Sequence, residues 1–319
     1  MTLLSNLDTV LKINNLYVGL KDMTIVKDFS LDIHKREIIG IVGESGCGKS
    51  TMLKSIVGLS DNNVSIQKGK IDFHGVSLRS MDQNQLRSIR GNKISFIFQK
   101  PDYTFDPVMK VKSQFFETVK FHTDGKANKK DCYKRSRELL EQLHFEAPDE
   151  VLESYPFELS GGMNQRIAVA MSMINEPELI LADEPTSALD VSVQSQVVRT
   201  LMELRDKTGV AILMVSHNIN VIASMADMVG VMYGGRMVEY GDAREVLQKS
   251  RHPYTKALLD AVPAMSQTMP ESIEGAPPRF SEILQGCPFR ERCPFSENKC
   301  ETEPAIQGDA SHWWLCHKQ

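Results

Sequence analysis

The sequence contains no apolar run that approaches the roughly 18 residues needed for a helix to span a bilayer. Its first residues also lack the basic patch followed by an apolar stretch that marks a secretory signal. We therefore expect a chain without a membrane span of its own, which stays in the cytosol unless something else holds it to a membrane.

Strong charge of either sign is absent as well. The formal net charge is −4 at pH 7, and no long basic tract occurs. The one basic cluster, between Lys126 and Arg137, is interleaved with and followed by acidic residues, which is typical of a solvated helix face. Internal repeats and low-complexity segments are also missing. This composition argues against nucleic acid as a partner.

Apolar residues, in contrast, are plentiful enough for a large core, since 41% of the 319 residues are hydrophobic and 24% are charged. This length accommodates one large or two ordinary domains. Short apolar runs at residues 37–42, 94–99, 179–183 and 211–216 are typical of buried strands, and residues 192–207 have a helical pattern. Continuous apolar strands that alternate with helices predict an α/β fold with a doubly covered parallel sheet.

The pattern changes at several other places along the chain. Near the start, residues 10–13 and 16–18 are predicted as two separate short strands. From about residue 108 to 175 the pattern is helical with proline and glycine punctuation, which predicts an inserted helical subdomain. Beyond residue 250 prolines break up the chain. We therefore predict a main domain of residues 1–250 and a C-terminal extension of residues 251–319.

A glycine-rich loop follows the strand predicted at residues 37–42 and precedes a helical pattern at residues 51–57, and it fits G-x-x-x-x-G-K-[ST]. In this pattern backbone N–H groups turn inward around a phosphate chain, and a lysine supplies the counter-charge. The helix N-terminus also favours an anion. The residues expected to bind a nucleotide are Gly43, Ser45, Gly46, Cys47, Gly48, Lys49, Ser50 and Thr51. Lys49 is expected to reach the β- and γ-phosphates, and Ser50 to bind Mg²⁺.

Polar residues stand just past two of the other predicted strands. Asp183 ends an apolar strand, where an unpaired carboxylate would be costly, so we expect it to hold the water shell of Mg²⁺. Glu184 comes next and is expected to act as the general base that orients the attacking water. His217 also follows a strand end, where the ligands of parallel sheets bind.

A second anion site is expected at Ser160, Gly161 and Gly162, because a serine and two glycine amides precede a helix that we place at residues 165–174. This half-site is separate in sequence from the phosphate loop. We therefore expect it to close on the nucleotide held by a neighbouring protomer.

The run Leu159-Ser160-Gly161-Gly162-Met163-Asn164-Gln165-Arg166 makes the chain resemble the ATP-binding cassette (ABC) ATPases of membrane transporters, over about residues 9–250. The resemblance implies a P-loop NTPase fold with ATP and Mg²⁺ as cofactors. It implies that Gln99 senses Mg²⁺ and the attacking water, and that His217 holds the γ-phosphate. It also implies that residues 160–162 contact the γ-phosphate in trans.

One departure from this family bears on nucleotide binding. The family usually carries an aromatic residue that stacks on adenine, and Leu20 stands at that place here. Adenine affinity is then lower, or a neighbouring apolar residue such as Val26 serves instead.

The extension resembles a more specific group. His252-Pro253-Tyr254-Thr255, Gly275-Ala276-Pro277-Pro278 and Gly286-Cys287-Pro288-Phe289 are similar to the C-terminal extension of oligopeptide and dipeptide transporter ATPases, as is Arg292-Cys293-Pro294. The resemblance implies an importer of di- or oligopeptides, with nickel-type importers as close relatives.

Cysteine is scarce until the extension, where four thiols follow the spacing C-x5-C-x6-C-x15-C. Lasting disulfides are not expected in a reducing cytosol. The spacing lacks the short pairs of a structural zinc site, whereas an iron–sulfur cluster needs only four thiolates on a compact scaffold. We predict a [4Fe–4S] cluster, which the resemblance also implies, with zinc or free buried thiols as alternatives. Its ligands would be Cys287, Cys293, Cys300 and Cys316.

These features predict the ATP-hydrolysing subunit of a membrane importer for di- or oligopeptides, peripheral to the cytoplasmic face of the cell membrane. The expected partners are a second ABC ATPase subunit, two transmembrane permease subunits and an extracytoplasmic peptide-binding protein, without nucleic acid. A nickel or other metal-chelate importer is the alternative within the same class, and a non-transport ABC ATPase is the alternative outside it.

Overall fold

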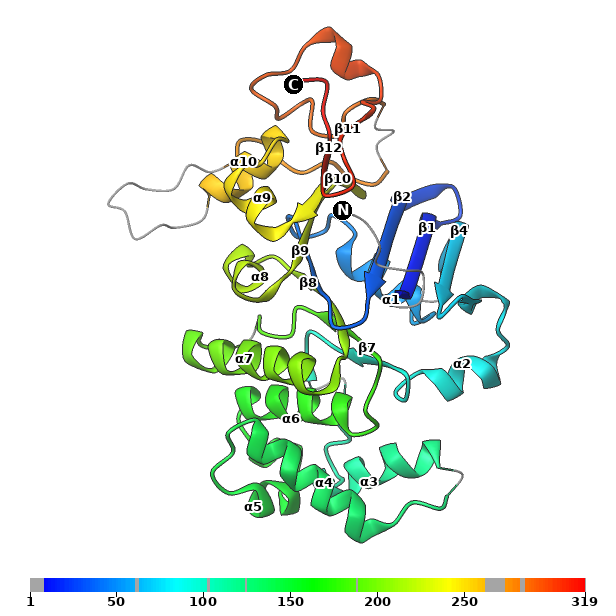
Figure 1. Ribbon diagram of the computed structural model, residues 1–319, viewed down its shortest axis with the longest axis vertical. Helices are drawn as coiled ribbons and strands as arrows, with labels where there is room; N and C mark the ends of the chain where they lie inside the picture. Colours follow the sequence, from blue (N-terminus) through cyan, green and yellow to red (C-terminus); the bar gives the residue numbers. More distant parts are fainter. Residues whose placement is uncertain are drawn as a thin grey trace. The chain divides into compact units, whose positions relative to one another are not determined.

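The computed structural model describes residues 9–60, 63–101, 104–123, 125–187, 189–261, 273–281 and 285–318. The chain forms two compact units, and most of their helices and strands are labelled in Figure 1. Within the described ranges, the helical unit contains residues 9–10, 34–36 and 80–214, and the phosphate-loop unit contains residues 11–33, 37–79 and 215–318.

One sheet of the phosphate-loop unit has the strand order β2-β1-β4-β5. Its strands are β1 (Thr9–Leu20), β2 (Met23–His34), β4 (Val64–Phe73) and β5 (Val76–Ser77). Because β1 is continuous, the prediction of two separate strands at residues 10–13 and 16–18 was wrong. The register against β4 shifts between Asn14 and Val18, and Asn15 has a φ of 46°, so a β-bulge carries the strand through the polar residues.

A second set of strands in this unit has the order β11-β12-β10-β9-β3. The strand before the phosphate loop, β3, is parallel to β9, and the strands from β9 to β11 are antiparallel to one another. The bounds are β3 (Ile38–Val42), β9 (Met228–Tyr233), β10 (Arg236–Asp242), β11 (Ile306–Gly308) and β12 (His312–Leu315). The helices are α1 (Lys49–Ile56), α8 (Ile219–Met225), α9 (Ala243–Gln248) and α10 (Pro253–Asp260).

The extension joins this sheet around one buried carboxylate. Glu239 of β10 is fully buried and lies opposite Trp314 of β12. Its two oxygens accept hydrogen bonds from the backbone N–H of Arg251 at 2.8 Å and of His252 at 2.9 Å, and His312 Nε2 lies 2.7 Å away. Residues on both sides of position 250 therefore belong to the same compact unit.

In the helical unit, β6 and β7 are parallel neighbours, and β8 lies beyond β7 in the strand order. Helices α3 to α6 pack on one another, and α6 also contacts β6 and α7. The strands are β6 (Ile94–Ile97), β7 (Leu179–Asp183) and β8 (Ala211–Ser216), the last of which ends in the other unit. The helices are α2 (Gln83–Ile89), α3 (Val111–His122), α4 (Lys129–Gln142), α5 (Pro148–Glu153), α6 (Gly161–Met173) and α7 (Val191–Thr208).

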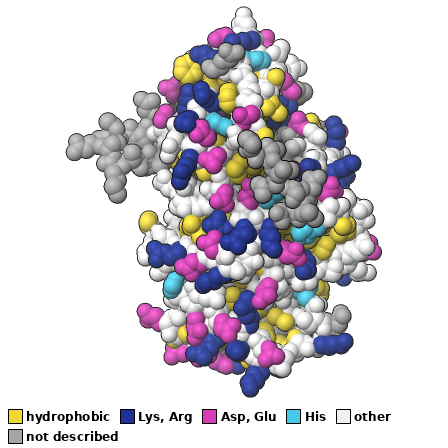
Figure 2. Space-filling view, in the orientation of Figure 1, with side chains coloured by type: hydrophobic (Ala, Val, Ile, Leu, Met, Phe, Trp, Pro, Cys, Tyr) yellow, Lys and Arg dark blue, Asp and Glu magenta, His cyan; other side chains and the backbone are white. Residues whose placement is uncertain are grey.

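Every residue of β3, β7 and β8 is buried, as expected for strands covered on both faces, and this agrees with the predicted α/β class. The predicted basic cluster lies on and just before α4, where Arg137 pairs with Glu141 at 3.3 Å. Figure 2 shows basic and acidic side chains interspersed over the visible surface. None of the helices in the described part of the chain is both long and apolar enough to cross a membrane.

Replacing Glu239 with alanine is expected to lower the free energy of unfolding by about 3–5 kcal/mol, because the N–H groups of Arg251 and His252 and the buried His312 ring lose their acceptor. Both tryptophans of the chain, Trp313 and Trp314, lie in β12, so their fluorescence during urea unfolding reports on this attachment.

Glu245→Ala is a matched control, since Glu245 is partly exposed and pairs with Lys249 at the surface. It should cost no more than about 1 kcal/mol. An equal loss of stability in the two variants would show that the buried carboxylate does not hold the extension.

Candidate functional site

The phosphate loop joins β3 to α1 through backbone conformations that favour glycine. Gly46 and Gly48 have φ values of 79° and 103°, in the left-handed region. A Cβ on Gly43 would lie 2.2 Å from the carbonyl oxygen of Met232, so no side chain fits there. Helix α1 begins directly after Gly48. The loop therefore has the tight turn that inward-facing N–H groups require.

Lys49 supplies positive charge to this loop. Its side chain is only 4% exposed, and its ammonium donates to the carbonyl oxygens of Gly43 at 2.7 Å and Glu44 at 3.0 Å. Carbonyl groups orient the ammonium without neutralising its charge. The Cys47 thiol lies 3.7 Å from the same nitrogen, and burial raises the pKa of that thiol, so it stays neutral. The buried charge thus favours an anion in the loop.

The other predicted residues of this unit are more accessible. Ser45 is exposed, and Ser50 and Thr51 are half-buried in the first turn of α1. His217 is exposed and directly follows β8.

Leu20, at the place where an adenine-stacking aromatic was expected, is half-buried at the end of β1. Val26 is fully buried, and its Cγ2 would lie 3.6 Å from a Cβ on Gly48. Val26 therefore lies beside the phosphate loop, but its fully buried side chain offers no surface to an adenine ring.

In the helical unit, Gln99 and Glu184 come together at the carboxyl ends of β6 and β7. Ile97 of β6 pairs with Ala182 of β7. Gln99 and Glu184 each lie two residues after this pair, so they leave the sheet at the same edge. Gln99 Nε2 donates to Glu184 Oε2 at 2.9 Å. Asp183, the last residue of β7, is 3% exposed. Parallel pairing thus gathers an amide and two carboxylates at one end of these strands.

Glu184 also has an unusual backbone. Its φ is 46°, in the left-handed region that residues other than glycine rarely adopt. Such strain costs on the order of 1–3 kcal/mol and is concentrated at functional positions. The side chain is 8% exposed, so its carboxylate is held in a largely buried place. The strained backbone and the burial both indicate that Glu184 has a functional role.

The predicted second anion site lies at the start of α6. Ser160 caps the helix, and its hydroxyl accepts a hydrogen bond from the Met163 N–H at 3.2 Å. This cap starts the helix at Gly161, so the predicted start at residue 165 was wrong. A Cβ on Gly161 would meet no atom within 4 Å. The space beside Gly161 is therefore open to a ligand, next to a first turn in which the Met163 N–H is already bonded to the Ser160 hydroxyl.

The predicted nucleotide residues thus form two sets. The phosphate loop and His217 belong to the phosphate-loop unit, and Gln99, Asp183, Glu184 and residues 160–162 belong to the helical unit. Within the helical unit, a hydrogen bond joins Gln99 to Glu184.

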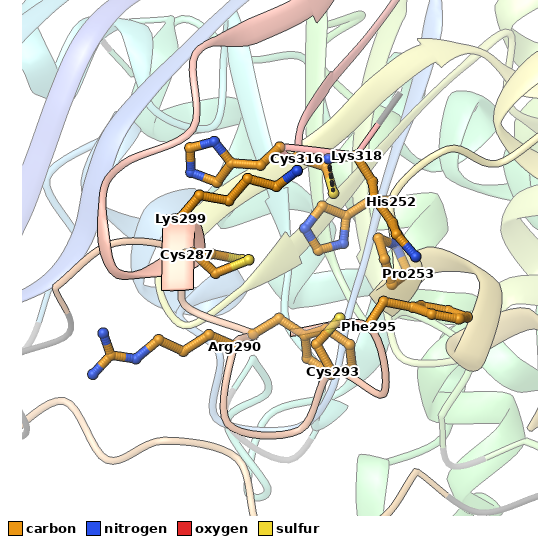
Figure 3. A pocket seen from close by; sticks show the side chains of 12 residues that line it. His252, Pro253, Cys287, Arg290, Cys293, Phe295, Lys299, Cys316 and Lys318 are labelled. Atoms are coloured by element: carbon orange, nitrogen blue, oxygen red, sulfur yellow. Dashed lines mark hydrogen bonds between the residues drawn. The ribbon is translucent and has the colours of Figure 1, made fainter. Parts of the chain in front are cut away.

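The four cysteines of the extension line a single pocket of the phosphate-loop unit, namely Cys287, Cys293, Cys300 and Cys316. Figure 3 shows the side chains of Cys287, Cys293 and Cys316 turned toward a common space. Gly286 makes this possible, because a Cβ there would lie 2.3 Å from the Cys300 carbonyl oxygen. The next residue, Cys287, donates its N–H to the same oxygen at 2.9 Å.

The geometry of this pocket does not by itself support the predicted iron–sulfur cluster. Burial raises the pKa of Cys287 to about 11 and also raises the pKa of Cys293, so a metal would have to displace the thiol protons on binding. Among the described residues, no group of three or more His, Cys, Asp or Glu side chains is arranged to hold a metal ion. The donor set fits a thiolate-bound metal, but the sulfurs do not stand in a ligating arrangement.

A histidine lines the same pocket. His252 is 1% exposed, and burial lowers its pKa to about 3, so the ring is neutral. Its Nδ1 accepts the N–H of Tyr254 at 3.1 Å, which assigns the ring proton to Nε2. A hydrogen-bond contribution from the Leu315 backbone opposes the effect of burial on this pKa, so the ring N–H is directed at that carbonyl, although the contact lies outside normal hydrogen-bond geometry. The pocket therefore contains a neutral imidazole beside four thiols.

Sequence reasoning missed two contacts that the extension makes with the phosphate loop. Arg292 forms an ion pair with the Glu44 carboxylate, and the Glu44 N–H donates to the Tyr254 hydroxyl at 2.9 Å. The partners are 248 and 210 residues apart in the sequence, so no local pattern could have indicated these contacts.

Two parts of the chain match known families. Residues 26–187 match the family described as ABC transporter. Residues 238–300 match the family described as oligopeptide/dipeptide transporter, C-terminal region. The second match ends at Cys300, so Cys316 lies outside it.

Similar proteins match over nearly the whole chain. The dipeptide transport ATP-binding protein of Bacillus subtilis is 39% identical over 295 residues, which cover 90% of this chain and 88% of that protein. The oligopeptide transport ATP-binding protein of Salmonella typhimurium is 37% identical over 306 residues, which cover 94% and 90% of the two chains.

Solved structures of cassettes share the fold. A dimeric ATP-binding cassette in a post-hydrolysis state, bound to ADP and Pi, matches with a TM-score of 0.66 and 28% identity over 73% of this chain and 99% of that one. A component of an ABC transporter complex from Clostridium perfringens matches with a TM-score of 0.65 and 25% identity, over 76% and 92% of the two chains. The predicted P-loop NTPase fold of the ABC type is confirmed.

Proposed function

Because the chain belongs to the ABC transporter family of ATP-binding proteins, we propose that it hydrolyses ATP to drive the import of dipeptides or oligopeptides. The observation that supports this substrate class most is the match of residues 238–300 to the oligopeptide/dipeptide transporter C-terminal region. The similar proteins of Bacillus subtilis and Salmonella typhimurium are named for the same two kinds of peptide. ATP and Mg²⁺ are the cofactors that this ATPase family implies.

We propose that residues 1–250 are the ATPase domain, with a helical subdomain at about residues 108–175, and that residues 251–319 are an extension of it. The packing of α3 to α6 on one another supports the subdomain. The pairing of β12 with β10 supports an extension that is attached to the ATPase domain.

In the proposed site, the phosphate loop binds the phosphates of ATP through its backbone N–H groups and through Lys49. The buried ammonium and the open space beside Gly46 support this role. Ser50, Gln99 and Asp183 are the proposed Mg²⁺ residues. An ion of this kind prefers oxygen ligands, which a hydroxyl, an amide and a carboxylate provide.

Glu184 is the proposed general base, which accepts a proton from the attacking water. The hydrogen bond from Gln99 holds the carboxylate in one orientation, and this supports the role. His217 is proposed to donate a hydrogen bond to the γ-phosphate. Its position directly after β8 and its exposure fit that assignment.

Residues 160–162 are proposed to complete the nucleotide site of a second cassette. The open approach to Gly161 supports a contact made from outside this chain. The partner cassette is a second ATPase subunit, and its closing on ATP would drive the permeases.

Glu184→Gln should abolish turnover, lowering kcat by about 10²–10⁴-fold, because an amide cannot accept the proton. ATP binding should persist, since the amide has nearly the same shape, and the variant should stay paired with its partner cassette when ATP is present. Steady-state phosphate release and size-exclusion chromatography with ATP measure the two effects.

Glu203→Gln is the matched control, because it makes the same chemical change on α7 at an exposed ion pair with Lys207. It should hydrolyse ATP at the normal rate. Unchanged hydrolysis in Glu184→Gln would mean that another residue is the base.

The proposed partners are two permease subunits and an extracytoplasmic peptide-binding protein, which place this chain at the cytoplasmic face of the membrane. Reconstitution of these partners with the ATPase in vesicles would test the substrate. Dipeptides or oligopeptides, delivered by the binding protein, should stimulate ATP hydrolysis. Stimulation by a nickel chelate and by neither peptide class would favour the metal importer instead, and failure to bind any permease would favour a non-transport ATPase.

We further propose that Cys287, Cys293, Cys300 and Cys316 hold a [4Fe–4S] cluster. Four thiols with no carboxylate among them, around one buried pocket, support a thiolate-bound metal over a hard cation. Zinc and free thiols remain the alternatives.

Protein purified without oxygen should contain about four iron and four acid-labile sulfide atoms per chain, as the cluster stoichiometry requires. Cys293→Ser should lose most of both, whereas Cys132→Ser, in α4 of the other unit, should retain them. Zinc without sulfide, or neither metal, would reject the cluster.

A further inference from the structure

We propose that Arg292 is a positioning residue for ATP binding, which holds the phosphate loop in its binding conformation through Glu44. The inference rests on the proposed binding of ATP by that loop. It assigns to the extension an indirect part in nucleotide binding, through Glu44, in addition to any metal that the cysteines hold.

The ion pair between Arg292 and Glu44 is bidentate and largely shielded from water. One guanidinium nitrogen of Arg292 donates to Glu44 Oε2 at 2.7 Å, and the other donates to Glu44 Oε1 at 3.0 Å. The Arg292 side chain is 6% exposed and the Glu44 side chain is 24% exposed. A forked pair of this kind is among the stronger and more directional charge-assisted hydrogen bonds.

The remaining donors of Arg292 fix the guanidinium itself. Its Nε donates to the Glu274 carbonyl oxygen at 2.8 Å, and a terminal nitrogen donates to the Ile273 carbonyl oxygen at 3.3 Å. The other terminal nitrogen donates to the Tyr233 hydroxyl at 3.2 Å. A guanidinium is always protonated in proteins, so the group stays charged. Arg292 is thus a fixed anchor.

A second link from the extension reaches the same residue. The Glu44 N–H donates to the hydroxyl of Tyr254, which is fully buried in α10. The Tyr254 ring packs against Tyr233 at 4.5 Å and against Phe289 at 5.3 Å between ring centroids. The extension therefore holds both the backbone and the side chain of Glu44.

Glu44 in turn shapes the part of the loop that meets phosphate. Its carbonyl oxygen accepts the Cys47 N–H at 3.3 Å and the Lys49 ammonium at 3.0 Å. If Glu44 moved, the turn and the lysine would both lose a partner. Holding Glu44 in place therefore removes conformational freedom that ATP would otherwise have to restrict, and preorganisation of this kind raises affinity.

The test is equilibrium binding of MgATP to the full-length chain, followed by steady-state hydrolysis. Arg292→Ala should raise the Kd for MgATP by roughly 5- to 150-fold, the range usual for coupling between sites. KM should rise in step, while kcat changes less, because the hydrolytic residues are untouched. The Kd of Arg292→Lys should lie between those of the unmodified chain and Arg292→Ala, since an ammonium keeps the charge but cannot form the forked pair.

Glu44→Gln tests the same interaction from its other side, because it removes the charge pair without altering the extension. It should also raise the Kd for MgATP. Combining it with Arg292→Ala should cost little beyond either change alone, as expected for two partners of one interaction. The control is Glu303→Gln, which removes another link between the extension and β10, the ion pair with Arg236. It should leave the Kd unchanged, and unaltered Trp313 and Trp314 fluorescence shows that the extension is folded in each variant.

The outcomes separate this inference from the function on which it rests. If the unmodified chain does not bind MgATP, the proposed function of the loop fails and the inference fails with it. If the unmodified chain binds MgATP and both Arg292→Ala and Glu44→Gln bind it equally well, only the role of Arg292 is overturned. Losses that add fully in the double variant would overturn it too, because they would mean that the two residues act separately.

Discussion

Backbone N–H groups can surround a phosphate only where the chain turns tightly. This constraint determines which neighbouring segments can pack against residues 43–49. Gly43 has no room for a side chain because the end of β9 lies against it. The turn after β9 closes on the loop from the same side, where the Gly235 N–H donates to the Cys47 carbonyl oxygen at 3.1 Å. The β9–β10 hairpin is therefore both a wall of the nucleotide loop and, through β12, the attachment point of the extension.

The parts of the site that could be predicted from sequence are those whose signals are local. The conformation of the glycine loop could be predicted, because the apolar strand before it, the glycines within it and the helix after it are all visible in one short stretch of sequence. The approach of Gln99 to Glu184 follows from another simple rule, since parallel strands end at the same edge of a sheet. The resemblance to ABC ATPases added roles for these residues, and their local geometry is compatible with those roles.

Other features depend on contacts between distant residues, or on a local choice that patterns do not reveal. The two strands predicted on either side of Asn15 are one strand, because β4 pairs with β1 both before and after the bulge. The serine cap moved the start of α6 to Gly161. The spacing of four cysteines indicated a metal site, yet the pocket they line is not arranged for one in the structure. The contacts of Glu44 cross more than 200 residues, so only the folded chain reveals them.

The positions of Tyr254 and Arg292 matter for anyone who divides this protein into pieces. A fragment that ends near residue 250 would carry every nucleotide motif of the sequence and yet lack both groups that hold Glu44. Its loop would be freer than that of the whole protein. Kinetic constants measured on such a truncated cassette would reflect the loss of these two groups. They would not be comparable with those of cassettes that naturally lack an extension.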